Sequence, residues 1–216
     1  SALLEQVTDD VIRSAFDSAG QRCSALRVLC IQEEIYEDLF EMIKGSMIIQ
    51  KMGDTNDFNT DIGPIINKEA LQKLNIYIDE CEKRGFDIFQ ASKSPSEKHI
   101  PPTLISINKI SDIRDEQFGP ILPILAYENL SELIEALNNQ NYGLSGSLWG
   151  SDLPKLQDIA GHIEAGRVFI NAARAMGHFA GELPAGGHKH SGLGWEKSVF
   201  GLREYYQYQT INGPIR

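Results

Sequence analysis

Residues 16–32, FDSAGQRCSALRVLCIQ, contain the three features that decide the fold of this chain. Gly20 stands where a helix over residues 11–19 would end, because glycine adopts the left-handed conformation that commonly ends helices. The apolar run at 27–32 shows no polar alternation, which predicts a strand buried on both faces. The stretch therefore predicts a helix, a sharp turn that carries Cys23, and a buried strand.

The same alternation of helix and strand continues along the chain. Apolar residues at helical spacing predict further helices at 33–47, 67–85, 131–138 and 152–162, and short apolar runs predict strands at 86–90, 103–107, 121–127, 144–150 and 167–171. Such alternation predicts an α/β fold with a mostly parallel sheet flanked by helices. Sites in these folds lie at the carboxyl ends of strands and at helix starts. No internal repeat is visible, so one domain is expected.

The C-terminal part of the chain has a different texture. Residues 172–194 are rich in glycine, which predicts irregular backbone packed closely against a neighbour. Residues 203–211 alternate aromatic and polar side chains, as an edge strand does. We therefore expect a C-terminal strand of the kind that pairs with a second subunit in a homo-oligomer.

Composition excludes several classes of function. The formal net charge is −10, with 20 Lys and Arg against 30 Asp and Glu, so nucleic acid is not an expected partner. No apolar run reaches the roughly 18 residues of a membrane span, and no signal peptide is expected. Three cysteines without a CxxC pair predict neither a disulfide framework nor a zinc site, and favour a cytoplasmic location. His188 and His190 sit in a glycine-rich loop, a weak signal, so no metal site is predicted.

Cys23 has two interpretations on the residues alone. A lone cysteine is more often a small buried residue than a catalytic one. A cysteine in a turn, however, lies near backbone N–H groups that stabilise negative charge, which favours a nucleophilic thiolate. Cys30 lies inside a predicted strand and Cys81 on the apolar face of a predicted helix, so both are predicted core residues.

Four motifs occur in an order that resembles the aldehyde dehydrogenase superfamily, over residues 17–211 and as its catalytic domain. The motifs are GQRCSALRV at 20–28, DEQFGPIL at 115–122, VFIN at 168–171 and PAGGHKHSGLGWE at 184–196. Residues 16–32 and TDIGPII at 60–66 are most similar to the pyrroline-5-carboxylate (glutamate-semialdehyde) dehydrogenases, including those of bifunctional proline-utilisation proteins. The resemblance implies an enzyme of proline catabolism.

The resemblance also implies roles for single residues. Cys23 would attack the aldehyde carbon to give a thiohemiacetal, whose hydride passes to NAD or NADP and leaves a thioester for hydrolysis. The backbone N–H of Cys23 would form half of the oxyanion hole. Glu116 would hold the hydroxyls of the nicotinamide ribose, Phe118 would pack beside that ring, and Leu144 would flank the nicotinamide. Ser24 matches a serine that helps to bind the substrate carboxylate.

The sequence departs from the pyrroline-5-carboxylate branch in one stretch. Residues 172–187, AARAMGHFAGELPAGG, are longer than the anchor loop of that branch, and Ala185 stands where a phenylalanine is usual. Arg174 in this stretch is a candidate partner for a substrate carboxylate. The substrate therefore stays open between glutamate γ-semialdehyde and another semialdehyde or aliphatic aldehyde.

The resemblance further implies an incomplete enzyme. In the family, the cofactor-binding domain, the glutamate that activates water and an oxyanion-hole asparagine precede the cysteine, and only 22 residues precede Cys23 here. We expect residues 1–216 to be a catalytic-domain fragment that lacks the N-terminal NAD-binding domain and is inactive by itself. Two other classes stay open: a cysteine hydrolase or acyltransferase in which a loop histidine activates Cys23, and a non-catalytic assembly module that uses 203–211.

Overall fold

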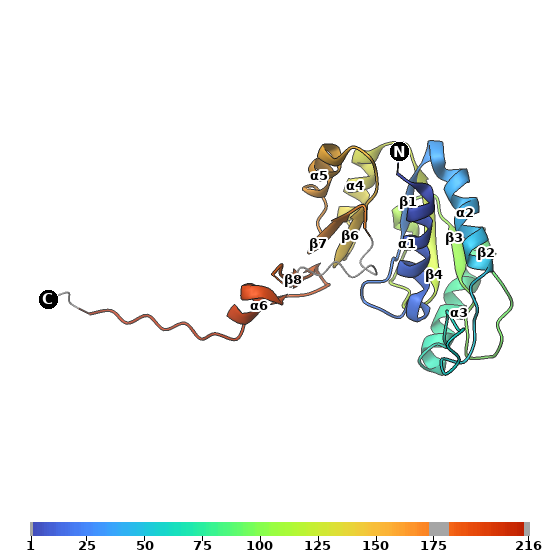
Figure 1. Ribbon diagram of the computed structural model, residues 1–216, viewed down its shortest axis with the longest axis horizontal. Coiled ribbons are helices and arrows are strands. Elements are labelled where there is room, and N and C mark those ends of the chain that lie inside the picture. Colours follow the sequence, from blue (N-terminus) through green and yellow to red (C-terminus); the bar gives the residue numbers. More distant parts are fainter. Residues whose placement is uncertain (1, 173–181, 214–216) are drawn as a thin grey trace.

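A four-stranded sheet lies at the centre of the computed structural model, which describes residues 2–172 and 182–213. Its strands, in spatial order, are β1 (Leu29–Gln32), β4 (Ile121–Tyr127), β3 (Thr103–Ser106) and β2 (Asp87–Gln90). The β1–β4 and β4–β3 pairs are parallel, and β2 is antiparallel to β3 (Figure 1). The predicted mostly parallel sheet is confirmed.

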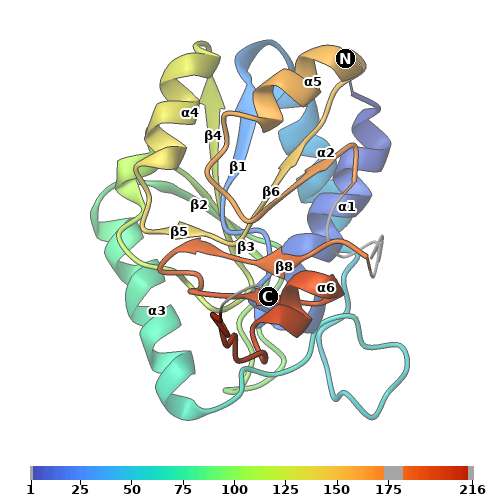
Figure 2. The ribbon, with the colours of Figure 1, turned by 90° about the vertical axis from the view of Figure 1, so that its left-hand side faces the viewer.

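Helices cover both faces of this sheet (Figure 2). The helices α1 (Leu4–Phe16) and α2 (Tyr36–Ile48) lie on one side, and α3 (Lys68–Lys83) and α4 (Leu130–Asn138) lie on the other. Between the layers lie fully buried apolar side chains, among them Phe16, Ile43, Met47, Leu104, Ile105, Leu122 and Ile124. Burial on both faces explains why the two central strands, β3 and β4, are the most apolar of this sheet.

Helix ends follow the chemistry of single residues. Asn67 caps α3, since its side-chain oxygen accepts a hydrogen bond from the Ala70 N–H at 2.8 Å. Gly85, just beyond that helix, adopts a φ of +79°. Asn129 caps α4 and Asp152 caps α5 (Leu153–Ala160) in the same way. The predicted helix boundaries at Asn67 and Gly85 are therefore confirmed.

A second, smaller sheet stands apart from the first (Figure 1). It consists of β6 (Ser145–Leu148) and β7 (Arg167–Ile170), which pair in parallel, with α5 connecting them. The sequence predicted all parallel strands in one sheet, whereas in the described residues β6 pairs with β7 alone. The length of each strand follows from local sequence, but its neighbour does not, because pairing depends on contacts between distant segments.

The glycine-rich part contains short strands that the sequence did not predict. β8 (Ala185–Gly186) pairs with β10 (Trp195–Glu196), and β9 (His188–Lys189) pairs with β5 (Tyr142–Gly143), both antiparallel. The close backbone approach predicted for this part is confirmed at Gly186. Its carbonyl oxygen lies so near Gly166 that a Cβ there would come within 1.9 Å.

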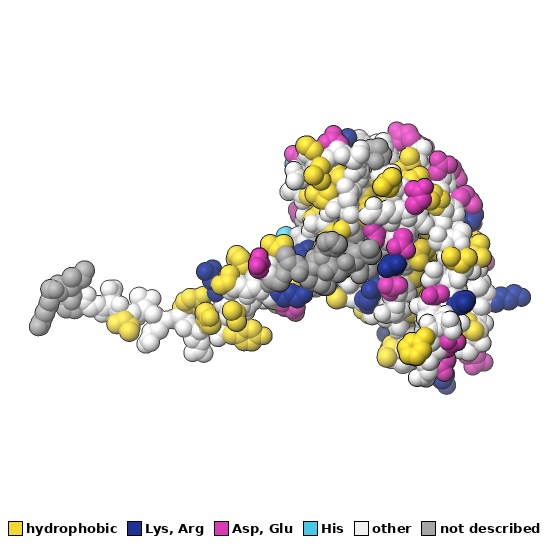
Figure 3. Space-filling view, in the orientation of Figure 1, with side chains coloured by type: hydrophobic (Ala, Val, Ile, Leu, Met, Phe, Trp, Pro, Cys, Tyr) yellow, Lys and Arg dark blue, Asp and Glu magenta, His cyan; other side chains and the backbone are white. Residues whose placement is uncertain are grey.

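The expected strand at 203–211 is not formed. Arg203 ends the helix α6 (Ser198–Arg203), and in the described tail residues 206–213 carry neither helix nor strand. Figure 3 shows the tail extending from the body with hydrophobic side chains along it. A strand requires a hydrogen-bonded neighbour, and within residues 2–172 and 182–213 no strand pairs with this segment. Among the described residues, no helix has the length and apolarity that crossing a membrane requires.

Candidate active site

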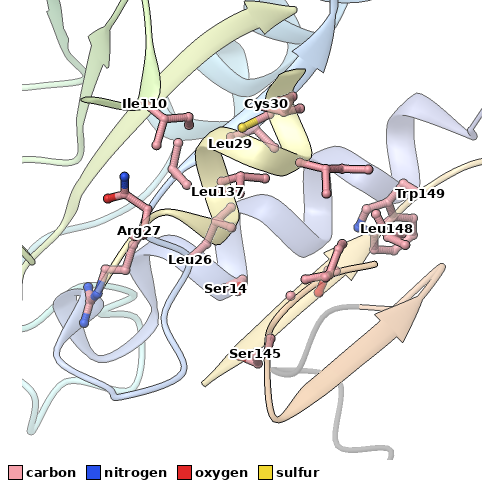
Figure 4. A pocket seen from close by; sticks show the side chains of 18 of the residues that line it. Ser14, Leu26, Arg27, Leu29, Cys30, Ile110, Leu137, Ser145, Leu148 and Trp149 are labelled. Carbon is pink, nitrogen blue, oxygen red and sulfur yellow. The ribbon is translucent and has the colours of Figure 1, made fainter. Parts of the chain in front are cut away.

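One cavity of about 870 Å³ lies between β1, α4 and β6 (Figure 4). Its lining includes five of the residues predicted from the sequence: Cys23, Ser24, Glu116, Phe118 and Leu144. They come from the turn before β1, the loop before β4 and the junction of β5 with β6. Arg174, the sixth, lies outside the described residues. The structure thus brings together residues that are up to 121 positions apart in the chain.

The turn that carries Cys23 has an unusual backbone. Ser18, Ala19 and Gly20 have φ values of 56°, 55° and 66°, a left-handed run that reverses the chain after α1. The predicted sharp turn at Gly20 is confirmed. Cys23 follows it, with an exposed side chain.

Flanking side chains hold this turn in place. The Arg22 guanidinium donates to the Arg13 carbonyl oxygen at 2.6 Å, at the end of α1. The Gln21 amide donates to the Pro64 carbonyl at 3.2 Å, and its oxygen accepts from the Ile66 N–H at 2.8 Å. Gln21 and Arg22, the two residues before Cys23, are therefore hydrogen-bonded to two separate segments, which anchor the turn that presents the thiol.

The loop that carries Glu116 touches the cysteine turn directly. A Cβ added to Gly20 would lie 2.2 Å from the Gly119 carbonyl oxygen and 2.8 Å from that of Ala15. Only a residue without a side chain permits this approach at a positive φ. Gly20 and Gly119 therefore form the contact that holds the Glu116 loop against the cysteine turn.

Arg27 joins the same two loops through its guanidinium, and sequence reasoning missed it. Its Nε donates to Glu116 Oε1 at 2.9 Å, its Nη1 to the Gly20 carbonyl at 2.8 Å and its Nη2 to the Arg22 carbonyl at 2.8 Å. Its Cζ lies 4.7 Å from the centre of the Phe118 ring. The only signal in the sequence was a charged residue at the start of an apolar run.

The positive charge of Arg27 is partly buried and has the Glu116 carboxylate as its acidic partner. Burial lowers the pKa of the Arg27 guanidinium, and the hydrogen bond and charge of Glu116, with a smaller Coulombic contribution from Cys23, offset part of this decrease. The cation thus lies close enough to both Glu116 and Cys23 to act on each electrostatically.

The other two cysteines belong to the core, as predicted. Cys30, which Figure 4 shows near Leu29, is half-buried against the core, and desolvation raises the pKa of its thiol to about 12. Cys81 is 1% exposed, and burial raises its pKa as well. A thiol reacts as the thiolate, so these two side chains are poor nucleophiles compared with the exposed Cys23.

Loop residues around Leu144 complete the lining. The Ser191 hydroxyl accepts a hydrogen bond from the Gly143 N–H at 3.0 Å, and the His190 N–H donates to the Asn141 carbonyl at 3.0 Å. Both residues line the cavity and both were missed as lining residues, although they lie in the motif at 184–196. The glycine-rich motif thus anchors the Leu144 strand junction.

The residues present fit the nicotinamide end of a dinucleotide. Phe118, 45% exposed, offers an apolar ring. Glu116 Oε1 accepts the bond from Arg27, and a carboxylate with two oxygens suits two adjacent ribose hydroxyls. An exposed thiol lies on the turn that contacts this loop, so a hydride acceptor and a nucleophile would meet here.

Comparison with known proteins gives consistent results. The sequence pattern of the aldehyde dehydrogenase family matches residues 1–211. Bifunctional protein PutA of Klebsiella aerogenes is 38% identical over 204 residues, which cover 90% of this chain and 16% of that protein. The chain therefore spans about a sixth of the length of that relative.

Two solved structures extend this similarity. A crystal structure of a mutant of Bradyrhizobium japonicum Proline Utilization A (PutA) has a TM-score of 0.85 and 34% identity, covering 91% of this chain and 20% of that one. Betaine aldehyde dehydrogenase (betB) of Staphylococcus aureus, in complex with NAD+, has a TM-score of 0.87 and 28% identity, covering 94% and 42%. With the family match over nearly the whole sequence, these similarities establish that the chain belongs to the aldehyde dehydrogenase family.

Proposed function

We propose that this chain forms the catalytic part of an NAD-dependent dehydrogenase that oxidises glutamate γ-semialdehyde to glutamate. The observation that carries the proposal is the placement of Cys23, Glu116, Phe118 and Leu144 around one cavity. NAD as cofactor is supported by the similarity to betaine aldehyde dehydrogenase, which was solved in complex with NAD+.

In this mechanism Cys23 acts as the nucleophile. Its thiolate forms a C–S bond with the aldehyde carbon, and the carbonyl oxygen becomes an oxyanion near the backbone N–H of Cys23. When bound, NAD+ supplies a hydride acceptor, so the thiohemiacetal collapses to a thioester. Water then cleaves the C–S bond, which releases the carboxylic acid and regenerates the thiol. Glu116 would hold the ribose, and Phe118 and Leu144 would bracket the nicotinamide.

The substrate class rests on two observations. The K. aerogenes PutA is 38% identical over 204 residues, and the B. japonicum PutA, 34% identical, is named for proline utilization. Ser24 lines the cavity next to Cys23, where its hydroxyl is available to a substrate carboxylate. The similarity to betaine aldehyde dehydrogenase favours a second candidate, an aldehyde that carries no carboxylate.

Steady-state kinetics would separate the two substrates. We expect kcat/KM for glutamate γ-semialdehyde to exceed that for betaine aldehyde or propanal by at least about tenfold, because recognition of a carboxylate contributes to binding in the transition state. NADH formation at 340 nm on the longest polypeptide that contains these residues measures this. A preference for propanal or betaine aldehyde would contradict the proposed substrate while leaving the dehydrogenase class intact.

We also propose that residues 1–216 work together with further polypeptide. The chain covers 16% of the K. aerogenes PutA and 42% of the betaine aldehyde dehydrogenase chain, so these relatives carry much additional sequence. The NAD-binding domain, and the groups that activate water and complete the oxyanion hole, would lie there. By itself the chain would bind NAD poorly.

The exposed tail supports a homo-oligomer. Tyr206, Tyr208 and Ile211 are 58%, 78% and 88% exposed along an extended segment. In a strand Tyr206 and Tyr208 would share one face and Ile211 would lie on the other, so the segment offers apolar side chains to a neighbour. We expect deletion of 204–216 to convert the oligomer to a smaller species in light scattering. Deletion of 212–216 alone is the matched control, since it leaves these three residues in place. An unchanged mass after the longer deletion would contradict the assignment.

A further inference from the structure

We propose that Arg27 is a positioning residue that fixes the Cys23 peptide group and the Glu116 carboxylate in one geometry. The inference rests on the function proposed above and deepens it. Its basis is the set of contacts made by one guanidinium: two backbone carbonyls of the cysteine turn, one carboxylate and one aromatic ring.

The contact with Arg22 is the decisive one. The Arg22 carbonyl belongs to the peptide bond that also contains the Cys23 N–H, and Arg27 Nη2 donates to it at 2.8 Å. In a trans peptide the C=O and the N–H point in opposite directions and share one plane. Holding and polarising the carbonyl therefore orients the Cys23 N–H and strengthens it as a donor to an oxyanion.

The contact with Glu116 acts on the other partner of the reaction. Arg27 Nε donates to Glu116 Oε1 at 2.9 Å, and the pair is partly shielded, with 21% and 31% of the two side chains exposed. The guanidinium also lies over the Phe118 ring, 4.7 Å from its centre, so the ring and the carboxylate contact the same cation. A shift of the cysteine turn would therefore shift the carboxylate that holds the ribose.

Lysine in place of Arg27 separates charge from geometry. An ammonium group retains the positive charge but lacks the planar fork that reaches a carboxylate and two carbonyls at once. We expect Arg27→Lys to raise KM for NAD and to lower kcat, each by about tenfold, because small displacements of reacting groups have large effects on rate. Arg27→Gln, which also loses the charge, is expected to lose more activity.

Arg84 provides a matched control. Its guanidinium pairs with Asp112 at 3.3 Å and lies 4.5 Å from the Phe86 ring, the same kinds of contact, but it does not line the cavity. Arg84→Lys and Arg84→Gln should leave KM for NAD within about twofold of the parent value. A drop in activity in both pairs of variants would overturn the assignment.

Alkylation of the three thiols distinguishes positioning from folding. With iodoacetamide at pH 7, a role in positioning predicts an alkylation rate of Cys23 in Arg27→Gln that differs from the parent rate by at least about twofold, because the turn that presents the thiol loses its hydrogen bonds to the guanidinium. Cys81 should stay protected because it is buried, and Cys30 should react slowly because desolvation raises the pKa of its thiol. Rapid alkylation of Cys30 and Cys81 in Arg27→Lys would show a merely structural residue and would overturn the proposal. Mass spectrometry reads all three sites in one sample of the full chain.

A double variant tests the coupling itself. If Arg27 acts on the cofactor through Glu116, KM for NAD in Arg27→Lys/Glu116→Gln should equal that in Glu116→Gln within about twofold. Independent effects that multiply would contradict the coupling. If Cys23→Ala and Glu116→Gln leave activity unchanged, the proposed function fails. If they reduce it but Arg27→Lys does not, only this inference fails.

Discussion

Replacing Cys23 with alanine is expected to abolish NAD-dependent aldehyde oxidation, with kcat falling at least about a thousandfold. The reason is chemical: without a sulfur at this position no thiohemiacetal and no thioester form, and hydride transfer from a hydrated aldehyde lacks the covalent route. NADH formation at 340 nm, measured on the longest polypeptide that contains these residues, gives the result.

Cys30→Ala is the matched control for this variant. Cys30 lies seven residues further along and lines the same cavity, but it is half-buried and desolvation raises the pKa of its thiol. We expect this variant to keep its activity within a few-fold and its circular dichroism spectrum unchanged. Retention of activity in Cys23→Ala would refute the nucleophile. Equal losses in both variants would indicate that the cavity has lost its shape.

A second large effect is expected on stability. Gly20→Ala should reduce the free energy of unfolding by about 2–4 kcal/mol, because the new Cβ would lie 2.2 Å from the Gly119 carbonyl oxygen at a φ of +66°. Backbone atoms on both sides must move, and the cysteine turn would then separate from the Glu116 loop. Urea unfolding followed by circular dichroism measures the loss, and slower aldehyde oxidation should accompany it.

Gly45→Ala provides the opposite expectation within the same chain. Gly45 lies in the middle of α2, and a Cβ there meets no atom within 4 Å. Alanine should stabilise the helix by about 0.5–1 kcal/mol, because glycine loses more backbone freedom on folding. If both glycine variants unfold at the parent urea concentration, the close contact between Gly20 and Gly119 is not what holds the two loops together.

The sequence predicted the features that depend on short stretches. The Asn67 cap, the turn at Gly20 and the strand at β1 follow from residues within a few positions of each other, and all three are present. The predicted burial of that strand on both faces is wrong, because β1 lies at the edge of the sheet and only Ile31 in it is buried. Cys30 and Cys81 were assigned to the core from their places in a strand and a helix. The order of four motifs also sufficed for the family, because each motif carries its own local chemistry.

One error occurred where pairing between distant segments decides: β6 and β7 form a sheet of their own rather than extending the central one. The strand expected at 203–211 was assigned a neighbour in a second subunit, and it stays a prediction. An alternating pattern gives the two faces of a strand but does not supply its hydrogen-bonding neighbour.

What the sequence alone determined is therefore the family, the thiol and the local elements that carry it. Only the tertiary structure decided that Arg27, 89 positions from Glu116, hydrogen-bonds to both the cysteine turn and the Glu116 loop. It also decided that Gly20 lies against Gly119. The physical reason is the separation along the sequence of the residues that interact. Caps, turns and periodicity act through neighbours in the chain, whereas the guanidinium contacts exist only after the sheet has brought β1 and β4 side by side.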